Sequence, residues 1–270
     1  MSVPRGDRFA DVAGGAAAIV VMLAAWEAAA RAGAISPIFF PPPSRVLAAL
    51  ATLAVDGRLW PHLGATLGRV TAGFTCGGGI GLLAGLAMGR SRRLRVVIEP
   101  LVAATHPVPK IALLPLAMLI FGLGEASKVA LVAVASFFPM ALSTEAGIRL
   151  LNPVHLEVAR NYGATGLRLY RRVILPGSLP MILTGVRLTL NVALLLAVAV
   201  ELVAGRIGLG RLVWFSWQTL RTEELYATLV VAALLGSAFH QFVRALERRF
   251  VPWVPSFSSQ SVVMTTPSPD

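Results

Sequence analysis

One lysine stands within a long apolar run and is the first candidate for chemistry. Lys110 lies within residues 100–124, where a helix would carry it near the middle of a hydrocarbon core roughly 30 Å thick. A charge at that depth costs about 2.5–3.5 kcal/mol and by default marks a functional site. Pro107 and Pro109 precede it and make the backbone irregular, which is tolerated where a segment lines a cavity. Lys110, Pro107, Pro109 and Glu201 are therefore our candidate pathway, one suited to an anion.

The alternative role for these charges is structural. Lys110 would then pair with Glu201 or Glu27, and Glu201 would hold an outer loop or gate. Arg69 and Arg187 lie near the ends of apolar runs, so we expect both side chains to snorkel toward the membrane surface.

Other chemistry is missing from the sequence. The four histidines have no metal-ligand spacing, no nucleophile motif stands out, and Cys76 is the single cysteine. No glycine-rich loop ends in Lys-Ser or Lys-Thr, so the chain itself does not bind ATP in the P-loop manner. We expect no metal, no cofactor and no enzymatic activity.

Composition indicates an integral membrane protein. Of 270 residues, 56% are hydrophobic and only 14% charged, against about 25% charged in soluble domains. The mean hydropathy is +0.74. This apolar content excludes a disordered chain.

We predict an all-α membrane protein with about six spanning helices, because the apolar runs lack the alternation of barrel strands. A segment 1–11 precedes the membrane domain 12–250, and a disordered tail 251–270 follows it. The first run also resembles a signal peptide, since Arg5 and Arg8 precede it and three alanines end it. The predicted spans are 12–30, 66–89, 97–122, 128–147, 180–203 and 225–245.

The basic residues orient these spans. With the N-terminus inside, the inner segments hold 14 of the 24 Lys and Arg residues and the outer segments hold seven. This excess predicts an inner-membrane protein with both termini cytoplasmic. It also explains the net charge of +11 without nucleic acid as a partner.

Glycine recurs every fourth residue in the second span, at Gly73, Gly77, Gly81 and Gly85. Residues four apart share one helical face, and a glycine face lets another backbone approach closely. The contact is either ordinary packing within the bundle or a sliding or oligomeric surface.

A loop at 152–176, between the fourth and fifth spans, has the pattern of two short amphipathic helices. Asn152 and Pro153 form a helix start, and we expect the first helix to end at Gly163. We expect the second to run from about Thr165 to about Ile174 and to end at Pro176 and Pro180. Such helices must rest on headgroups or on a partner protein.

This loop resembles that of importer permeases of the ATP-binding-cassette class. The family pattern is Glu-Ala-Ala, three residues, Gly, nine residues, then Ile-x-Leu-Pro. All spacings match, with Val replacing Ala at 158 and Ile at 173. The matching residues are Glu157, Ala159, Gly163, Val173, Leu175 and Pro176. Residues 40–250 further resemble the nitrate, sulfonate and taurine subgroup, notably in the run from Pro107 to Gly124.

The resemblance implies a transport subunit whose loop docks on a cytoplasmic ATPase, which binds ATP and Mg. It also implies a dimeric ATPase, a second copy of this chain and an extracytoplasmic binding protein that delivers the substrate. Small anions such as sulfonates, taurine, nitrate or bicarbonate are the implied cargo; related permeases carry neutral pyrimidine-like precursors. An ion-coupled secondary transporter is the first alternative function, although the two halves of the sequence show no repeat. A membrane enzyme is the second, although the sequence lacks catalytic groups.

Overall fold

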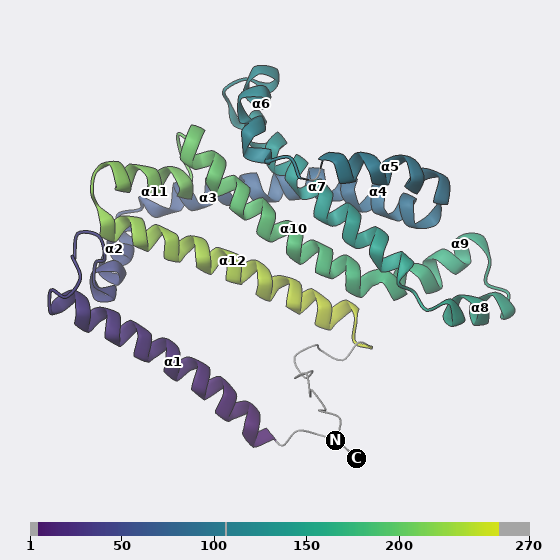
Figure 1. The fold of residues 1–270 in the computed structure, drawn as a ribbon, viewed down its shortest axis with the longest axis horizontal. Helices are drawn as coiled ribbons and strands as arrows, with labels where there is room; N and C mark the ends of the chain where they lie inside the picture. The colour runs from purple at the N-terminus through teal and green to yellow at the C-terminus, as the bar shows by residue number, and fades with distance from the viewer. Residues whose placement is uncertain (1–4, 106, 254–270) are drawn as a thin grey trace, which may run out of the picture. The chain divides into compact units, whose positions relative to one another are not determined.

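The chain is built from helices joined by short turns (Figure 1). The structure, a computed structural model, describes residues 5–105 and 107–253, and no strand occurs within these ranges. The predicted N-terminal segment 1–11 and tail 251–270 therefore lie partly outside the described residues. The long helices are α1 (Arg5–Arg31), α7 (Glu125–Arg149), α10 (Leu175–Ala204) and α12 (Thr222–Phe250).

Shorter elements connect them. These are α2 (Pro43–Val55), α3 (Leu59–Gly73), the π-helical η1 (Phe74–Gly78), α4 (Gly79–Arg90), α5 (Arg92–Thr105), the 3-10 turn η2 (Lys110–Leu113), α6 (Leu114–Phe121), α8 (Pro153–Asn161), α9 (Gly166–Leu169), the π-helical η3 (Tyr170–Ile174) and α11 (Leu209–Gln218).

Four helical stretches among the described residues are long and apolar enough to cross a membrane. They are Leu59–Arg90, Glu125–Arg149, Gly166–Ala204 and Thr222–Phe250, and each contains one predicted span. Large apolar side chains lie exposed on them, such as Leu83 and Leu195, at 67% and 74%. Such exposure suits a surface solvated by lipid tails.

The other two predicted spans look different. Residues 12–30 lie inside α1. Residues 97–122 are divided among α5, η2 and α6, because Pro107 and Pro109 lack backbone donors and disfavour helix in the residues before them. That stretch is therefore not a single helix, and α6 is an apolar helix of only eight residues.

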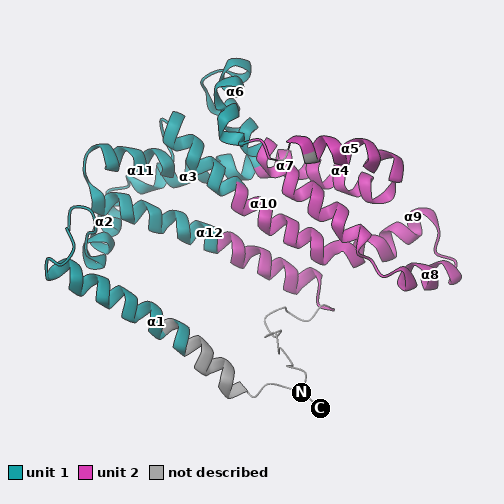
Figure 2. Cartoon of the chain, in the orientation of Figure 1, with its two compact units in different colours: residues 1–73, 109–133, 193–237 teal, residues 74–108, 134–192, 238–270 magenta. Residues whose placement is uncertain are grey.

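The chain divides into two compact units (Figure 2), formed by residues 1–73, 109–133 and 193–237 and by residues 74–108, 134–192 and 238–270. In unit 1, α2, α3, α11 and the start of α12 share a core. Its buried residues are Val46, Leu53, Leu59, Leu209, Leu212, Ala227 and Val231. A second cluster joins α6 to α7 and α10 through Leu114, Ala117, Leu131 and Val200.

Unit 2 is held together by close helix contacts at glycine. A Cβ on Gly85 of α4 would lie 2.5 Å from the Thr144 Cβ and 2.6 Å from the Ala141 carbonyl oxygen of α7. Gly81 meets α7 in the same way. Where α7 meets α10, a Cβ on Gly147 would lie 2.8 Å from the Met181 Cβ. The glycine face of α4 thus packs within the chain, which favours the packing interpretation over a sliding surface. In unit 1, Gly73 lies equally close to Val132.

Candidate functional site: the interhelical loop and the buried charges

The helix start predicted at Asn152 is confirmed. Asn152 Oδ1 accepts a hydrogen bond of 2.9 Å from the Val154 N–H, and Pro153 occupies the first helical position. Both features satisfy or remove free backbone donors at a helix start. The first helix of the loop, α8, is thereby fixed by its own sequence.

The end of α8 explains why glycine stands at 163. Gly163 has φ of +79°, a left-handed conformation that costs other residues about 1–2 kcal/mol. The Gly163 N–H donates to the Arg160 carbonyl and the Ala164 N–H donates to the Ala159 carbonyl, each at 2.9 Å. This pair of bonds is a Schellman cap. The spacing from Ala159 to Gly163 is therefore the spacing of a helix terminus.

An apolar stripe lies on the exposed side of α8. Val154, Val158 and Tyr162 follow one another at intervals of four, which places them on one helical face. They are 57%, 47% and 89% exposed. Glu157 beside them is exposed and has no hydrogen bond or ion pair to any residue the structure describes. This stripe and Glu157 form a surface that the described chain leaves uncovered; we call it the α8 surface.

The second half of the loop corrects the prediction that Pro176 and Pro180 end a separate helix. Residues Gly166–Ala204 form one continuous helix through α9, η3 and α10. The π-turn at Tyr170–Ile174 widens the helix where the ring of Pro176 would otherwise meet the carbonyl four residues earlier. Val173, Leu175 and Pro176 are half-buried along it.

Unit 1 contains a cluster of buried charges centred on Arg69, which is 2% exposed. Its Nη1 donates to Glu201 Oε1 at 2.6 Å and to the Ile207 carbonyl at 2.8 Å. Its Nε and Nη2 donate to the two carboxylate oxygens of Glu125 at 2.5 and 2.8 Å, and Lys128 Nζ donates to Glu125 at 2.9 Å. The expectation that Arg69 snorkels is wrong, because two carboxylates compensate its charge inside the protein.

Glu201, fully buried, holds the turn between α10 and α11. Its Oε2 accepts from the Thr66 hydroxyl and from the Gly210 N–H, each at 2.9 Å. Thr66 in turn accepts from the Leu209 N–H at 2.9 Å. These bonds occupy backbone donors at the start of α11, so Glu201 fixes this loop to α3. The structure thus places Glu201 in the loop-holding role weighed above.

Lys110 begins η2, half-buried, after the exposed Pro107 and Pro109. The two carboxylates suggested as its partners are engaged elsewhere. Glu201 is bound as described, and Glu27 accepts from the Ser44 hydroxyl and pairs with Arg31 at 2.6 Å. Whether Lys110 lines a pathway stays a prediction.

Arg187 also binds a carboxylate instead of snorkelling to the membrane surface. It pairs with Glu247 of α12, within unit 2. In both arginines, helix-to-helix pairing replaces the expected snorkelling.

The sequence of residues 77–254 matches the family described as the binding-protein-dependent transport system inner membrane component. The chain belongs to this family. The taurine transport system permease protein TauC of Escherichia coli (strain K12) is 38% identical over 240 residues, covering 87% of each chain. A candidate aliphatic sulfonates transport permease, SsuC of Bacillus subtilis (strain 168), is 34% identical and covers 88% of this chain and 86% of its own.

A solved structure of the MetNI methionine transporter has the same fold. It superposes with a TM-score of 0.56 at 22% identity, covering 73% of this chain and 98% of that one.

Membership in this permease family makes the chain a non-enzymatic inner-membrane component of an importer. The importer class implies a separate ATPase and a binding protein. The matched residues include the loop, Lys110 and Glu201 but not Arg69.

Sequence reasoning missed the Arg69 cluster. The signal that could have found it is a group of four charged residues near the outer ends of predicted spans, two basic and two acidic. They are Arg69, Lys128, Glu125 and Glu201.

Proposed function

We propose that this permease carries a small organic sulfonate, of the taurine or alkanesulfonate type, across the inner membrane. The two curated relatives described above support this cargo by their names and by identities of 34–38% over most of the chain. A lysine at Lys110, near the predicted middle of the bilayer, suits an anionic cargo. A neutral pyrimidine-like precursor is the competing cargo.

The observation that carries the transport mechanism is the α8 surface. Three apolar side chains four residues apart stand exposed beside Glu157, on a helix whose two ends are rigidly capped. An amphipathic helix with exposed anchors at such spacing suits a groove on a partner protein. We assign that groove to a cytoplasmic ATPase, whose closure would be transmitted through the continuous helix Gly166–Ala204.

The complete assembly in this proposal has two copies of the permease, two ATPase subunits and an extracytoplasmic binding protein, with both permease termini cytoplasmic. Lipid covers the exposed apolar faces of the spanning helices. The basic-residue asymmetry supports the orientation. A cytoplasmic reporter fused at the C-terminus should be active, and a periplasmic one inactive.

The test is reconstitution of the permease with its ATPase and binding protein in liposomes. Taurine or ethanesulfonate on the binding protein should stimulate ATP hydrolysis and be taken up only when ATP is present. Stimulation by a pyrimidine precursor alone would replace the sulfonate assignment. Uptake driven by an ion gradient without ATP would contradict the ATPase-driven mechanism.

A further inference from the structure

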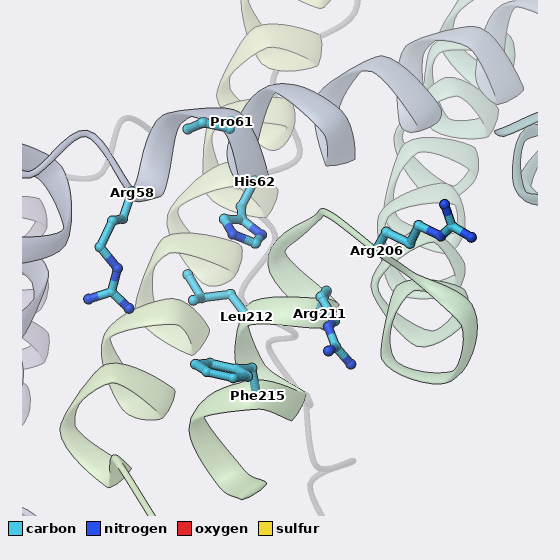
Figure 3. A pocket seen from close by; sticks show the side chains of 7 residues that line it. All are labelled: Arg58, Pro61, His62, Arg206, Arg211, Leu212 and Phe215. Carbon is cyan, nitrogen blue, oxygen red and sulfur yellow. The ribbon is translucent and has the colours of Figure 1, made fainter. Parts of the chain in front are cut away.

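Unit 1 contains a cationic pocket beside the turn that Glu201 holds. Its volume is about 400 Å³, within the 300–1,000 Å³ typical of small-molecule sites. Arginine side chains stand on its two sides, with the rings of His62 and Phe215 between them (Figure 3). The lining residues are Arg58, Pro61, His62, Arg206, Arg211, Leu212 and Phe215.

Two of the three arginines have no counter-charge among the described residues. Arg58 donates two hydrogen bonds of 3.0 Å to the carboxylate of Glu224, and these raise the pKa of its guanidinium above the ordinary value. Arg206 and Arg211 have neither a hydrogen bond nor an ion pair to any part of the chain that the structure describes. None of the described residues that line the pocket is acidic, so the lining carries a net positive charge.

The wall behind these charges is fixed. His62 Nδ1 lies 2.8 Å from the Gly208 carbonyl oxygen and 3.1 Å from the Gly208 nitrogen. Its Nε2 has no partner among the residues described and remains available to a ligand. Gly208 and Arg211 belong to the turn and helix that Glu201 holds against α3. The pocket therefore keeps its shape while the long arginine side chains can reorient.

The cationic and the apolar walls of the pocket together suit a ligand that has an anionic head and a short apolar stem. Guanidinium groups bind the oxygens of an oxyanion through paired, charge-assisted hydrogen bonds. Pro61, Leu212 and Phe215 offer apolar surface for a short hydrocarbon stem. A small volume excludes large cargo.

We propose that this pocket is an oxyanion subsite that receives the sulfonate group of the cargo at Arg206 and Arg211, with the stem against Phe215. This inference rests on the proposed function, because it takes the cargo to be a sulfonate. In the proposed orientation the pocket faces the extracytoplasmic side, where the cargo arrives. Positive potential in a low-dielectric pocket raises the local concentration of an anion.

Direct binding tests the pocket without the binding protein. The permease–ATPase complex in phosphatidylcholine nanodiscs is titrated calorimetrically with ethanesulfonate, and with neutral ethanesulfonamide as the matched ligand. Ethanesulfonate should bind and the sulfonamide should not. Arg206→Gln and Arg211→Gln should each weaken binding about tenfold, the loss expected for a hydrogen bond to a charged group. Arg45→Gln removes a charge of the same sign from an exposed side chain outside the pocket and should leave the affinity unchanged.

Three results would overturn the subsite. The first is equal ethanesulfonate affinity in the wild type and in the Arg206→Gln/Arg211→Gln variant. The second is no ethanesulfonate binding at millimolar concentration. The third is loss of ethanesulfonate binding when phosphatidylglycerol is added, which would assign the pocket to a lipid headgroup.

Uptake separates this inference from the proposed function. If wild-type liposomes take up ethanesulfonate but the double variant has the same KM, the subsite is wrong and the function stands. If the wild type takes up only a neutral cargo, the function is wrong. Reduced uptake with unchanged ethanesulfonate binding would assign the arginines to a protein partner and overturn the subsite.

Discussion

Glu201 and Glu125 bind the same arginine, and their different burial provides a sharp test of the charge cluster. The Glu201 side chain is fully buried, whereas that of Glu125 is 59% exposed. We expect Glu201→Gln to destabilise the protein far more than Glu125→Gln. Each change removes one negative charge and keeps nearly the same side-chain volume.

The geometry sets the magnitude for Glu201→Gln. The amide oxygen can still accept from Arg69, but the amide nitrogen then faces the Gly210 N–H, which donates to Glu201 Oε2 at 2.9 Å. Two donors meet, and Arg69 loses its buried counter-charge. Breaking a buried pair in this way costs about 3–5 kcal/mol. For Glu125→Gln we expect a smaller loss, because water already screens the exposed carboxylate and Arg69 keeps Glu201 as its buried counter-charge.

Thermal unfolding of the detergent-solubilised permease, followed by tryptophan fluorescence, measures the difference. One kcal/mol shifts the midpoint by about 2–4 °C in a chain of this size. We expect Tm to fall by about 6–20 °C for Glu201→Gln and by clearly less for Glu125→Gln. The double variant Arg69→Gln/Glu201→Gln should lose less than the two single losses added together, since neither charge is then left alone.

Equal shifts for the two glutamates would refute the argument from burial. Strict additivity in the double variant would show that Arg69 and Glu201 do not interact.

Three further predictions concern other parts of the chain. Gly163→Leu should leave insertion normal but reduce ATPase stimulation several-fold, whereas Gly163→Asn, which tolerates a positive φ, should keep most of it. Gly85→Ala should lower Tm because its Cβ would meet Thr144, while Gly68→Ala, with nothing within 4 Å of its Cβ, should not. Lys110→Met should lose most sulfonate uptake per inserted molecule and Lys110→Arg should keep part of it; normal uptake by the methionine variant would exclude the lysine from the pathway.

Helix-capping rules, which involve only residues close in sequence, correctly predicted where α8 begins and ends. A cap needs only a side chain and a backbone group two residues away, so Asn152 was sufficient to place the start of α8. Gly163 marked its end because glycine takes the positive φ of a helix C-cap without steric cost. Pro176 misled the prediction because the π-turn at Tyr170–Ile174 widens the helix just before it, so the helix continues where a break was expected.

The charge cluster could not be predicted from local rules. Arg69 is 56 residues from Glu125 and 132 residues from Glu201, so its partners depend on which helix ends meet in the fold. Snorkelling was the expected answer for an arginine considered on one helix alone. The pocket of Arg206 and Arg211 escaped notice similarly, since its walls come from α3 and α11.

The distance along the chain between Arg69 and Glu201 also has a consequence for biosynthesis. At about 5–20 residues per second, the ribosome reaches Glu201 roughly 7–26 s after Arg69, which lies 132 residues earlier. Throughout that interval α3 would carry an arginine whose burial in lipid costs about 2.5–3.5 kcal/mol. Glu125 emerges earlier but is the exposed partner. We therefore expect the part of α3 around Arg69 to stay at the aqueous edge of the insertion machinery and to enter the membrane only when the end of α10 brings Glu201 to neutralise it.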